Sequence, residues 1–329
     1  MRILVIRLSS IGDIILTTPI LKEFKRKYPD STLDFLVLDK FKDAIEGCPY
    51  IDNLILFNKE KNDGFSNIIK FGKELKKNNY DYVFDLHAKA RSIIITKAIG
   101  AKTYTYKKRS LKKTMLVKMR MSRYEVDNTI VRNYFGAFKE FNLNYIGEDL
   151  TFSFSEEDLK SVEKYNGHPI LAVGASKETK KWTEEGFGKL ASLIYKKYGK
   201  MPILIGSNGE YEMCERIRKI SGEKCINLAG KLSLKESGAL LSKAMFLVTN
   251  DSGPFHIARG VKCKTFVIFG PTDPKMFEYD ENNILIYKGE ICSPCSLHGD
   301  KQCPKKHFNC MRKLAAEEVM EQIEKKYRG

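Results

Sequence analysis

The stretch that decides the fold is Asn250-Asp251-Ser252-Gly253-Pro254-Phe255-His256-Ile257-Ala258. It follows the apolar run 245–248, which is typical of a buried strand, and its Gly-Pro pair interrupts that strand. The residues after the proline are typical of the first turn of a helix, which Asp251 or Ser252 would cap. Open α/β sheets bind ligands at such strand-to-helix turns, and a helix N-terminus suits phosphate. An ordinary capped turn with His256 in the core is the alternative.

Strand and helix alternate through the whole second half of the chain. The predicted strands are Ile170–Val173, Ile203–Ile205, Cys225–Leu228, Phe246–Val248 and Thr265–Phe269. The predicted helices are Glu184–Tyr198, Tyr211–Ser221, Leu234–Ala244, which begins with a capping box of Ser233 and Glu236, and the final Arg312–Lys326. This order predicts a doubly wound parallel sheet.

Polar or glycine-rich loops follow the strands of this half. Because the carboxyl ends of parallel strands share one edge of a sheet, several such loops predict a binding crevice there. Ser176 and Lys180, with the N–H groups before Phe255, suit a diphosphate, and the carboxylate of Glu210 suits ribose hydroxyls. The loops therefore predict a nucleotide site, with neither a Walker loop nor an evident acidic metal cluster in the sequence.

The first half opens with the same order of strand and helix. Its predicted strands are residues 1–8, 33–38, 54–57 and 80–86, and its predicted helices are about 14–27, 65–77 and 128–141. The first turn contains one glycine only, so the dinucleotide fingerprint G-x-G-x-x-G is absent. The polar stretch 155–165 predicts the boundary between an N-terminal domain, residues 1–155, and a C-terminal domain, residues 156–329.

Polar side chains also follow two strands of the first half. Asp13 lies at the mouth of the predicted sheet, either as a general base beside a substrate hydroxyl or as a first-turn acid that the helix dipole stabilises. Lys89 and Arg91 follow the strand 80–86 and would bind an anionic acceptor, unless they belong to a solvated loop.

The net charge of +16 and the isoelectric point near 9.3 imply an anionic partner. No apolar run reaches the length of about 18 residues that a transmembrane helix needs, and no signal peptide is visible, so we expect the protein in the cytoplasm. Residues 102–123 carry Lys and Arg without an acid, interleaved with Leu and Met. That pattern favours an anionic membrane surface, although nucleic-acid phosphates or a solvated loop would also explain it.

Four of the eight cysteines cluster near the end of the chain, together with His298 and His307. The density suggests a structural zinc, but the spacing matches no standard finger, and paired or free thiols that brace the fold are the favoured alternative. We expect no catalytic use of the cluster, whose members are Cys292, Cys295, Cys303 and Cys310.

Taken together, these motifs identify a family. The opening Arg7-Leu8-Ser9-Ser10-Ile11-Gly12-Asp13, then Lys180-Lys181-Trp182, then residues 250–256 occur in the order found in the lipopolysaccharide heptosyltransferases of glycosyltransferase family 9, which the sequence resembles over nearly its whole length. The resemblance implies a GT-B fold, in which two Rossmann-like domains face a central cleft. It also implies an inverting, metal-independent transfer of heptose from ADP-heptose to the inner core of lipopolysaccharide.

The resemblance further implies roles for individual residues. Asp13 would be the general base, with a modestly raised pKa that burial on domain closure would provide. Ser176 and Lys180 would hold the diphosphate. Glu210 would bind the ribose, and the donor pocket would be completed by Asp251, Ser252, Gly253 and His256. The acceptor would meet Ser10, Gly12, Lys89 and Arg91. Because that acceptor is an anionic lipid, residues 102–123 would dock on the inner face of the cytoplasmic membrane, where the protein would be peripheral.

Two other functions are compatible with parts of the sequence. A glycosyltransferase of the same fold with another nucleotide sugar would build a different surface glycan. A basic nucleic-acid-binding protein would explain the charge of +16 but not the polar loops at the strand ends, so we expect no nucleic acid.

Overall fold

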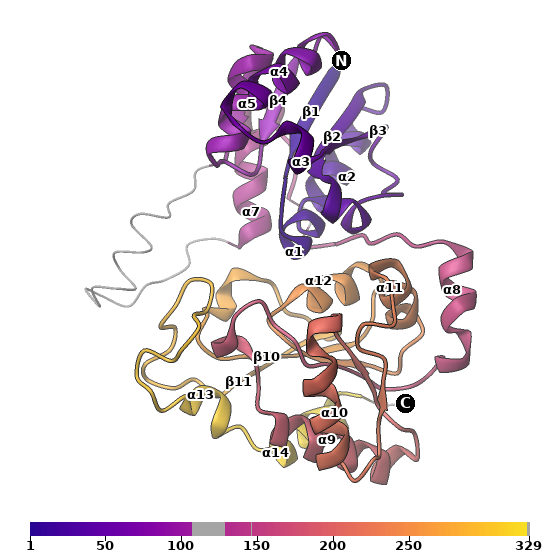
Figure 1. Ribbon diagram of the computed structural model, residues 1–329. Coiled ribbons are helices and arrows are strands. Elements are labelled where there is room, and N and C mark those ends of the chain that lie inside the picture. Colours follow the sequence, from indigo (N-terminus) through magenta and orange to yellow (C-terminus); the bar gives the residue numbers. More distant parts are fainter. Residues whose placement is uncertain (107–128, 146, 328–329) are drawn as a thin grey trace. The chain divides into compact units, whose positions relative to one another are not determined.

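The computed structural model describes residues 1–106, 129–145 and 147–327. The chain divides into two compact units, of which unit 1 contains the described residues up to Ser153 and unit 2 those from Phe154. Each unit has one parallel sheet with helices on both faces (Figure 1). This confirms the predicted α/β class with two Rossmann-like sheets.

Unit 1 has five parallel strands in the order β3-β2-β1-β4-β5. They are β1 (Arg2–Ile6), β2 (Thr32–Leu38), β3 (Asn53–Phe57), β4 (Tyr82–Asp85) and β5 (Lys102–Thr105). Its helices are α1 (Ile11–Ile15), α2 (Thr18–Lys27), α3 (Lys59–Asn62), α4 (Phe65–Lys76), α5 (Ala90–Ile99) and α7 (Ile130–Phe135), with 3-10 turns at Asp39–Ala44 and Gly136–Phe141. The strand order reverses between β1 and β4, so the loops that follow these strands flank the switch point of the sheet.

Successive residues of these strands pack on opposite faces of the sheet. Val83 belongs to an apolar cluster with residues of α4 and α5, such as Ile68 and Ile95. Phe84, the next residue, stacks on Phe138 with ring centroids 3.7 Å apart. Apolar side chains therefore cover both faces of the sheet, and the polar groups described below lie at the two ends of its strands.

A buried aspartate, Asp34, collects hydrogen bonds from several strands at the end of the sheet where the strands begin. Asp34 of β2 is fully buried, and its carboxylate accepts hydrogen bonds from Arg2, Asn53 and Tyr80, each at 2.8 Å. These partners come from β1, from β3 and from the segment before β4. One carboxylate therefore joins four successive parts of unit 1.

Unit 2 has six parallel strands in the order β11-β10-β9-β6-β7-β8. They are β6 (Ile170–Ala172), β7 (Ile203–Ile205), β8 (Ile226–Asn227), β9 (Leu247–Asn250), β10 (Thr265–Phe269) and β11 (Asn283–Tyr287). Its helices are α8 (Glu156–Val162), α9 (Glu184–Tyr198), α10 (Tyr211–Ile220), α11 (Leu234–Ser242), α12 (Gly253–Gly260), α13 (Asn309–Arg312) and α14 (Ala316–Lys326), with 3-10 turns at Glu163–Tyr165, Glu178–Lys180, Asn208–Glu210 and Pro274–Met276. Here the order reverses between β6 and β9.

Helices α9, α10 and α14 cover one face of this sheet and α11 and α12 the other (Figure 1). The predicted capping box of α11 is confirmed, because Ser233 Oγ accepts from the Glu236 N–H at 3.0 Å while the Glu236 carboxylate accepts from the Ser233 N–H at 2.7 Å. In the described part of the chain, none of the helices combines the length and the apolar character needed to span a bilayer.

Some predicted elements differ from those observed. The helix predicted over 14–27 is broken into α1 and α2, because Pro19 has no N–H to donate to the Ile15 carbonyl, and the Thr18 hydroxyl donates to it instead at 2.8 Å. Helix α5 and the edge strands β5 and β11 are additional to the prediction. Of the basic segment 102–123, the residues from 107 on lie outside the described residues.

Candidate functional site

A buried arginine occupies the switch point of unit 1. Arg7 follows β1, and its Nη1 donates to the carbonyl oxygen of Leu86, which follows β4. Its Nη2 lies 2.6 Å from Oδ2 of Asp13, and its guanidinium lies over the ring of Tyr134, 5.7 Å from the centroid. One cation therefore joins both loops at the switch point and holds the Asp13 carboxylate.

Asp13 lies in α1, and its side chain is 33% exposed. The same Oδ2 accepts from Ser10 Oγ at 3.1 Å. Burial acts to raise the pKa of Asp13, but the charge of Arg7 and the hydrogen bonds from Arg7 and Ser10 outweigh burial and lower this pKa. The expectation of a raised pKa is thus corrected by the structure, because Arg7 keeps the carboxylate ionised at neutral pH.

The loop after β4 is shaped by a carboxylate that the sequence analysis did not single out. Asp85 is buried and accepts the N–H groups of His87 and Ala88, at 3.0 Å and 2.9 Å. Burial raises the pKa of Asp85, and these hydrogen bonds oppose the rise. The carboxylate holds this loop in place beside Arg7, and His87 is buried within it.

Lys89 and Arg91 lie where α5 begins. Lys89 is the exposed N-cap residue, and its N–H donates to Ser92 Oγ at 3.1 Å. The Arg91 guanidinium pairs with Asp63 at 2.9 Å and lies 5.5 Å from the centroid of the Phe57 ring. Arg91 is therefore already paired with a carboxylate that precedes α4, and an anionic acceptor would have to compete with Asp63 for it.

The switch point of unit 2 also holds an ion pair. Lys180 follows β6 and Asp251 follows β9, and their Nζ and Oδ2 atoms are 2.6 Å apart, with side-chain exposures of 12% and 6%. Asp251 Oδ2 also accepts from Thr272 Oγ1, at 2.9 Å, which follows β10. Loops from three strands therefore converge on one carboxylate.

Asn250, the last residue of β9, connects these loops through its side-chain amide. Its Nδ2 donates to the Val173 carbonyl oxygen at 2.8 Å, and its Oδ1 accepts from the Trp182 N–H at 2.9 Å. The buried Asn250 side chain thus holds the beginning and the end of the loop that carries Lys180. Its role was not predicted, although a buried polar residue at the end of an apolar strand is a signal for one.

Glu210 lies at the carboxyl edge between β6 and β7. Its Oε2 accepts from Ser207 N at 2.7 Å and from Ser207 Oγ at 2.9 Å. A Cβ atom at position 174 would lie 1.8 Å from Glu210 Oε1, so Gly174 is the residue that lets this carboxylate lie over the loop after β6. The predicted ribose-binding residue therefore lies over the beginning of the loop that carries Lys180.

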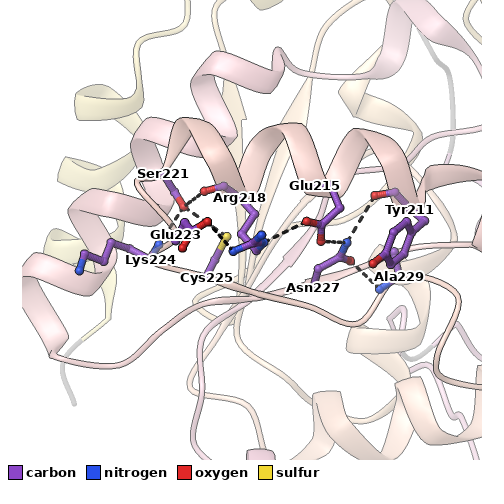
Figure 2. Close-up of polar contacts among 9 residues, drawn as sticks. All are labelled: Tyr211, Glu215, Arg218, Ser221, Glu223, Lys224, Cys225, Asn227 and Ala229. Atoms are coloured by element: carbon purple, nitrogen blue, oxygen red, sulfur yellow. Dashed lines mark hydrogen bonds and ion pairs between the residues drawn. The ribbon is translucent and has the colours of Figure 1, made fainter.

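A chain of polar contacts fixes the helix that follows Glu210 (Figure 2). Asn227 of β8 donates to the carboxylate of Glu215 at 2.7 Å, and its Oδ1 accepts from the Ala229 N–H at 2.9 Å. Glu215 also accepts from Arg218 at 3.0 Å, and Arg218 pairs with Glu223 at 3.2 Å. The contacts of Asn227 attach α10 to β8 and to the loop after it, whereas the Arg218–Glu223 pair lies at the C-terminal end of α10, away from Glu210.

The remaining predicted donor residues differ in their surroundings. Ser252 is the N-cap residue of α12 but makes no side-chain cap hydrogen bond, and Asp251 is bound to Lys180 and Thr272, so the predicted side-chain cap is wrong. Ser252 Oγ lies 3.4 Å from Thr249 Oγ1. His256 is buried, and its ring packs against that of Phe277, with centroids 5.0 Å apart. Gly253 is the first residue of α12, and Ser176 is exposed in the loop after β6.

The four clustered cysteines are free thiols in the structure. Burial and the neighbouring Cys292 and Cys303 raise the pKa of Cys295 to about 11, and burial with the neighbouring thiols raises that of Cys310 to about 12. Cys292 Sγ lies 3.9 Å from Nε2 of His307. Across residues 1–106, 129–145 and 147–327, no group of three His, Cys, Asp or Glu side chains is arranged to hold a metal ion.

The chain is similar to known proteins over most of its length. The family model described as glycosyltransferase family 9 (heptosyltransferase) matches residues 68–308. Lipopolysaccharide heptosyltransferase 1 of Campylobacter coli is 26% identical, over 98% of this chain and 98% of its own. The crystal structure of the family 9 glycosyl transferase from Veillonella parvula has a TM-score of 0.81 at 21% identity, over 98% of this chain and 96% of that one. E. coli heptosyltransferase WaaC with ADP-2-deoxy-2-fluoro heptose has a TM-score of 0.73 at 19% identity, over 99% of both chains.

Proposed function

The chain belongs to glycosyltransferase family 9, the heptosyltransferases, and we propose from this that it moves heptose from ADP-heptose to the inner core of lipopolysaccharide. The names of its relatives support the acceptor, since those from Campylobacter coli and Escherichia coli are lipopolysaccharide heptosyltransferases. The WaaC structure supports the donor, since it holds an ADP-heptose analogue. The comparisons favour neither a different nucleotide sugar nor a nucleic acid.

One observation carries the proposal at the level of residues. Unit 2 holds a nearly buried lysine, Lys180, at the switch point of its sheet, where ligands of doubly wound folds bind. An ammonium group with little exposure to water interacts strongly with a phosphate, because solvent screens it less. The lysine is thus suited to the diphosphate of a nucleotide sugar.

We assign the donor to unit 2 on this basis. Lys180 and Ser176 bind the diphosphate and offset the negative charge that grows on ADP as it leaves. Asp251 keeps Lys180 at the switch point before the donor arrives, through the 2.6 Å ion pair. Glu210 accepts hydrogen bonds from the ribose hydroxyls. The pocket between phosphate and sugar is completed by Ser252, Gly253 and His256.

The chemical step uses Asp13 as the general base. The acceptor oxygen attacks the anomeric carbon of heptose from the face opposite ADP, so the new C–O bond forms as the bond to the ADP phosphate oxygen breaks. The acceptor proton passes to Asp13, and ADP departs with the bonding electrons, with inversion at the carbon. Because Arg7 lowers the pKa of Asp13, the carboxylate is already ionised and ready to take the proton at neutral pH.

We assign the acceptor to the loops of unit 1. Ser10 and Gly12 belong to the same turn as Asp13, and Lys89 and Arg91 supply positive charge for an acidic sugar or phosphate. Residues 102–123 would add a contact with an anionic membrane surface, and the protein would then be cytoplasmic and peripheral to the inner face of the membrane.

The proposed reaction needs no metal, because Lys180 and the N–H groups at the start of α12 supply the charge that the leaving diphosphate requires. The four cysteines serve the fold rather than the chemistry. Because burial raises the pKa of Cys295 to about 11 and that of Cys310 to about 12, these two thiols are protonated at neutral pH and are therefore weak nucleophiles.

Calorimetric titration with ADP, UDP and GDP in the absence of added metal tests the proposal. We expect ADP alone to bind, and Lys180→Ala to weaken that binding. A preference for UDP would assign the chain another donor. Failure to bind any of the three, together with RNA binding that weakens steeply with salt, would refute the proposed function.

A further inference from the structure

The segment between β11 and α13, residues 290–308, packs on loops that meet at the unit 2 switch point. We call it the cysteine-rich loop, since it contains Cys292, Cys295 and Cys303. It binds the start of the loop that carries Thr272, because Ser293 Oγ donates to the Gly270 carbonyl oxygen and the Cys295 N–H donates to that of Pro271 at 2.9 Å. Both contacts lie beside the hydroxyl that binds Asp251.

The same cysteine-rich loop binds the residue before Lys180. The Thr179 N–H and its Oγ1 hydroxyl both donate to the Asp300 carbonyl oxygen, each at 3.1 Å, and Thr179 Oγ1 accepts from the Asp300 N–H at 2.8 Å. Thr179 is buried, so water does not compete freely for these bonds. We call this set of three hydrogen bonds the Thr179–Asp300 clasp.

Close packing accompanies the clasp. Gly299, with φ of +77°, lies so near the stem of Lys180 that a Cβ atom there would be 2.7 Å from Lys180 Cγ. A side chain at position 299 would therefore displace the lysine stem. The glycine allows both the positive φ and the close approach.

Lys180 is thus held from both sides along the chain. Thr179 binds Asp300 before it, and Trp182 after it binds Asn250 through its N–H at 2.9 Å and the Leu314 carbonyl oxygen through Nε1 at 3.1 Å. Lysine has a long flexible stem, and a phosphate ligand would otherwise have to restrict both the loop and the stem when it binds.

We propose that Thr179 is a positioning residue for the donor, which through its clasp with Asp300 of the cysteine-rich loop holds Lys180 where the diphosphate binds. The inference rests on the proposed function of the unit 2 site. The cysteine-rich loop then influences donor affinity without contacting the donor. Its Asp300 holds Thr179, and Thr179 holds Lys180.

The test compares variants of the full chain by calorimetric titration with ADP and by thermal unfolding. Thr179→Val keeps the shape of the side chain but removes two of the three hydrogen bonds, so we expect the Kd for ADP to rise about tenfold. Thr179→Ser keeps the hydroxyl and should bind ADP nearly as wild type does. Thr265→Val is the matched control, because Thr265 is also buried and its hydroxyl donates to the Cys263 carbonyl at 2.9 Å, but it lies where β10 begins, at the opposite edge of the sheet.

A double-mutant cycle separates positioning from a general loss of structure. If Thr179 acts through Lys180, Thr179→Val should have little further effect on ADP affinity in the Lys180→Ala background, whereas independent effects would multiply. Wild-type affinity in Thr179→Val, or an equal loss in Thr265→Val, would overturn the inference while leaving the proposed function intact. Failure of the wild-type protein to bind ADP would instead remove the proposed function, and the inference with it. Should Thr179→Val not fold, Thr179→Ala gives the second variant, because it also removes the two hydroxyl bonds of the clasp and should weaken ADP binding by a similar factor. Wild-type affinity in Thr179→Ala would refute the inference.

Discussion

Replacement of Arg7 by methionine should move the acid limb of the activity profile to higher pH. The Arg7 Nη2 atom lies 2.6 Å from Asp13 Oδ2, and an arginine beside an aspartate lowers the carboxyl pKa by about 1–3 units. Methionine removes this charge but leaves the burial that acts to raise the pKa of Asp13. The acid limb should therefore rise by about 1–3 pH units.

The direction follows from which form of Asp13 is active. A general base works only when ionised, so activity falls as the pH drops through the pKa of Asp13. In the wild-type protein this pKa lies below the ordinary value of 3.8, and Asp13 should cause no loss of kcat/KM between neutral pH and about pH 5. The ion pair also makes the stability of the fold depend on pH. Because the pKa of Asp13 is lower in the folded than in the unfolded protein, Asp13 adds to the free energy of unfolding above its unfolded pKa. That addition is lost as the pH falls through the folded pKa.

The assay is kcat/KM for heptose transfer from ADP-heptose to an inner-core acceptor, measured across pH with thermal unfolding at each point. Arg7→Lys is the matched control, because it keeps the cation and should shift the limb much less. ADP affinity should change little in both variants, since Arg7 belongs to unit 1. A folded Arg7→Met protein with the wild-type acid limb would refute the reasoning, because Arg7 would then not govern the pKa of the base.

Three further substitutions probe other parts of the chain. Asp13→Asn should lower kcat by about 10²–10⁴ in the transfer assay while calorimetry finds unchanged ADP affinity, and comparable kcat would exclude Asp13 as the base. Asp251→Asn leaves the nearly buried Lys180 without its counter-charge, so the free energy of unfolding measured by urea titration should fall by about 1–3 kcal/mol. An unchanged free energy of unfolding would show that water solvates the lysine instead. Ser233→Ala removes one half of the α11 capping box and should cost about 1 kcal/mol in the same measurement, while an exposed serine without such a bond, Ser176→Ala, should cost almost nothing.

The fold was largely predictable because buried parallel strands and amphipathic helices leave strong patterns. The stretch around Asn250 predicted a strand, a turn and a helix, which are β9 and α12. Two of the missed elements have weak patterns. Strand β5 is polar and mostly exposed at the edge of its sheet, and α5 has three consecutive isoleucines, Ile93–Ile95, but no clear helical stripe. Strand β11 is a short apolar run that the pattern allows but that the sequence analysis did not single out.

The structure brings predicted site residues together in pairs that the sequence analysis did not predict. Lys180 and Asp251 were both expected at the donor site, yet an ion pair across 71 positions of sequence has no local signal. The motif that contains Arg7 predicts no role for it, because Leu86 reaches Arg7 only when β1 and β4 become neighbours, and the turn that brings Asp13 back to Arg7 has no sequence signal. Sequence patterns report the period of burial, whereas these contacts depend on the order of strands in the sheet.

The buried carboxylate of Asp34 determines when unit 1 can fold as the chain is synthesised. Its ligands Arg2, Asn53 and Tyr80 are separated by up to 46 positions from Asp34, and the last of them leaves the ribosome well after β1 and β2. Until Tyr80 arrives, burying Asp34 leaves one of its hydrogen bonds unmade, which disfavours early closure of the first strands on each other. A nascent chain that ends before Tyr80 should therefore not fold stably. We expect unit 1 to fold cooperatively only after β4 has left the ribosome and can pair with β1.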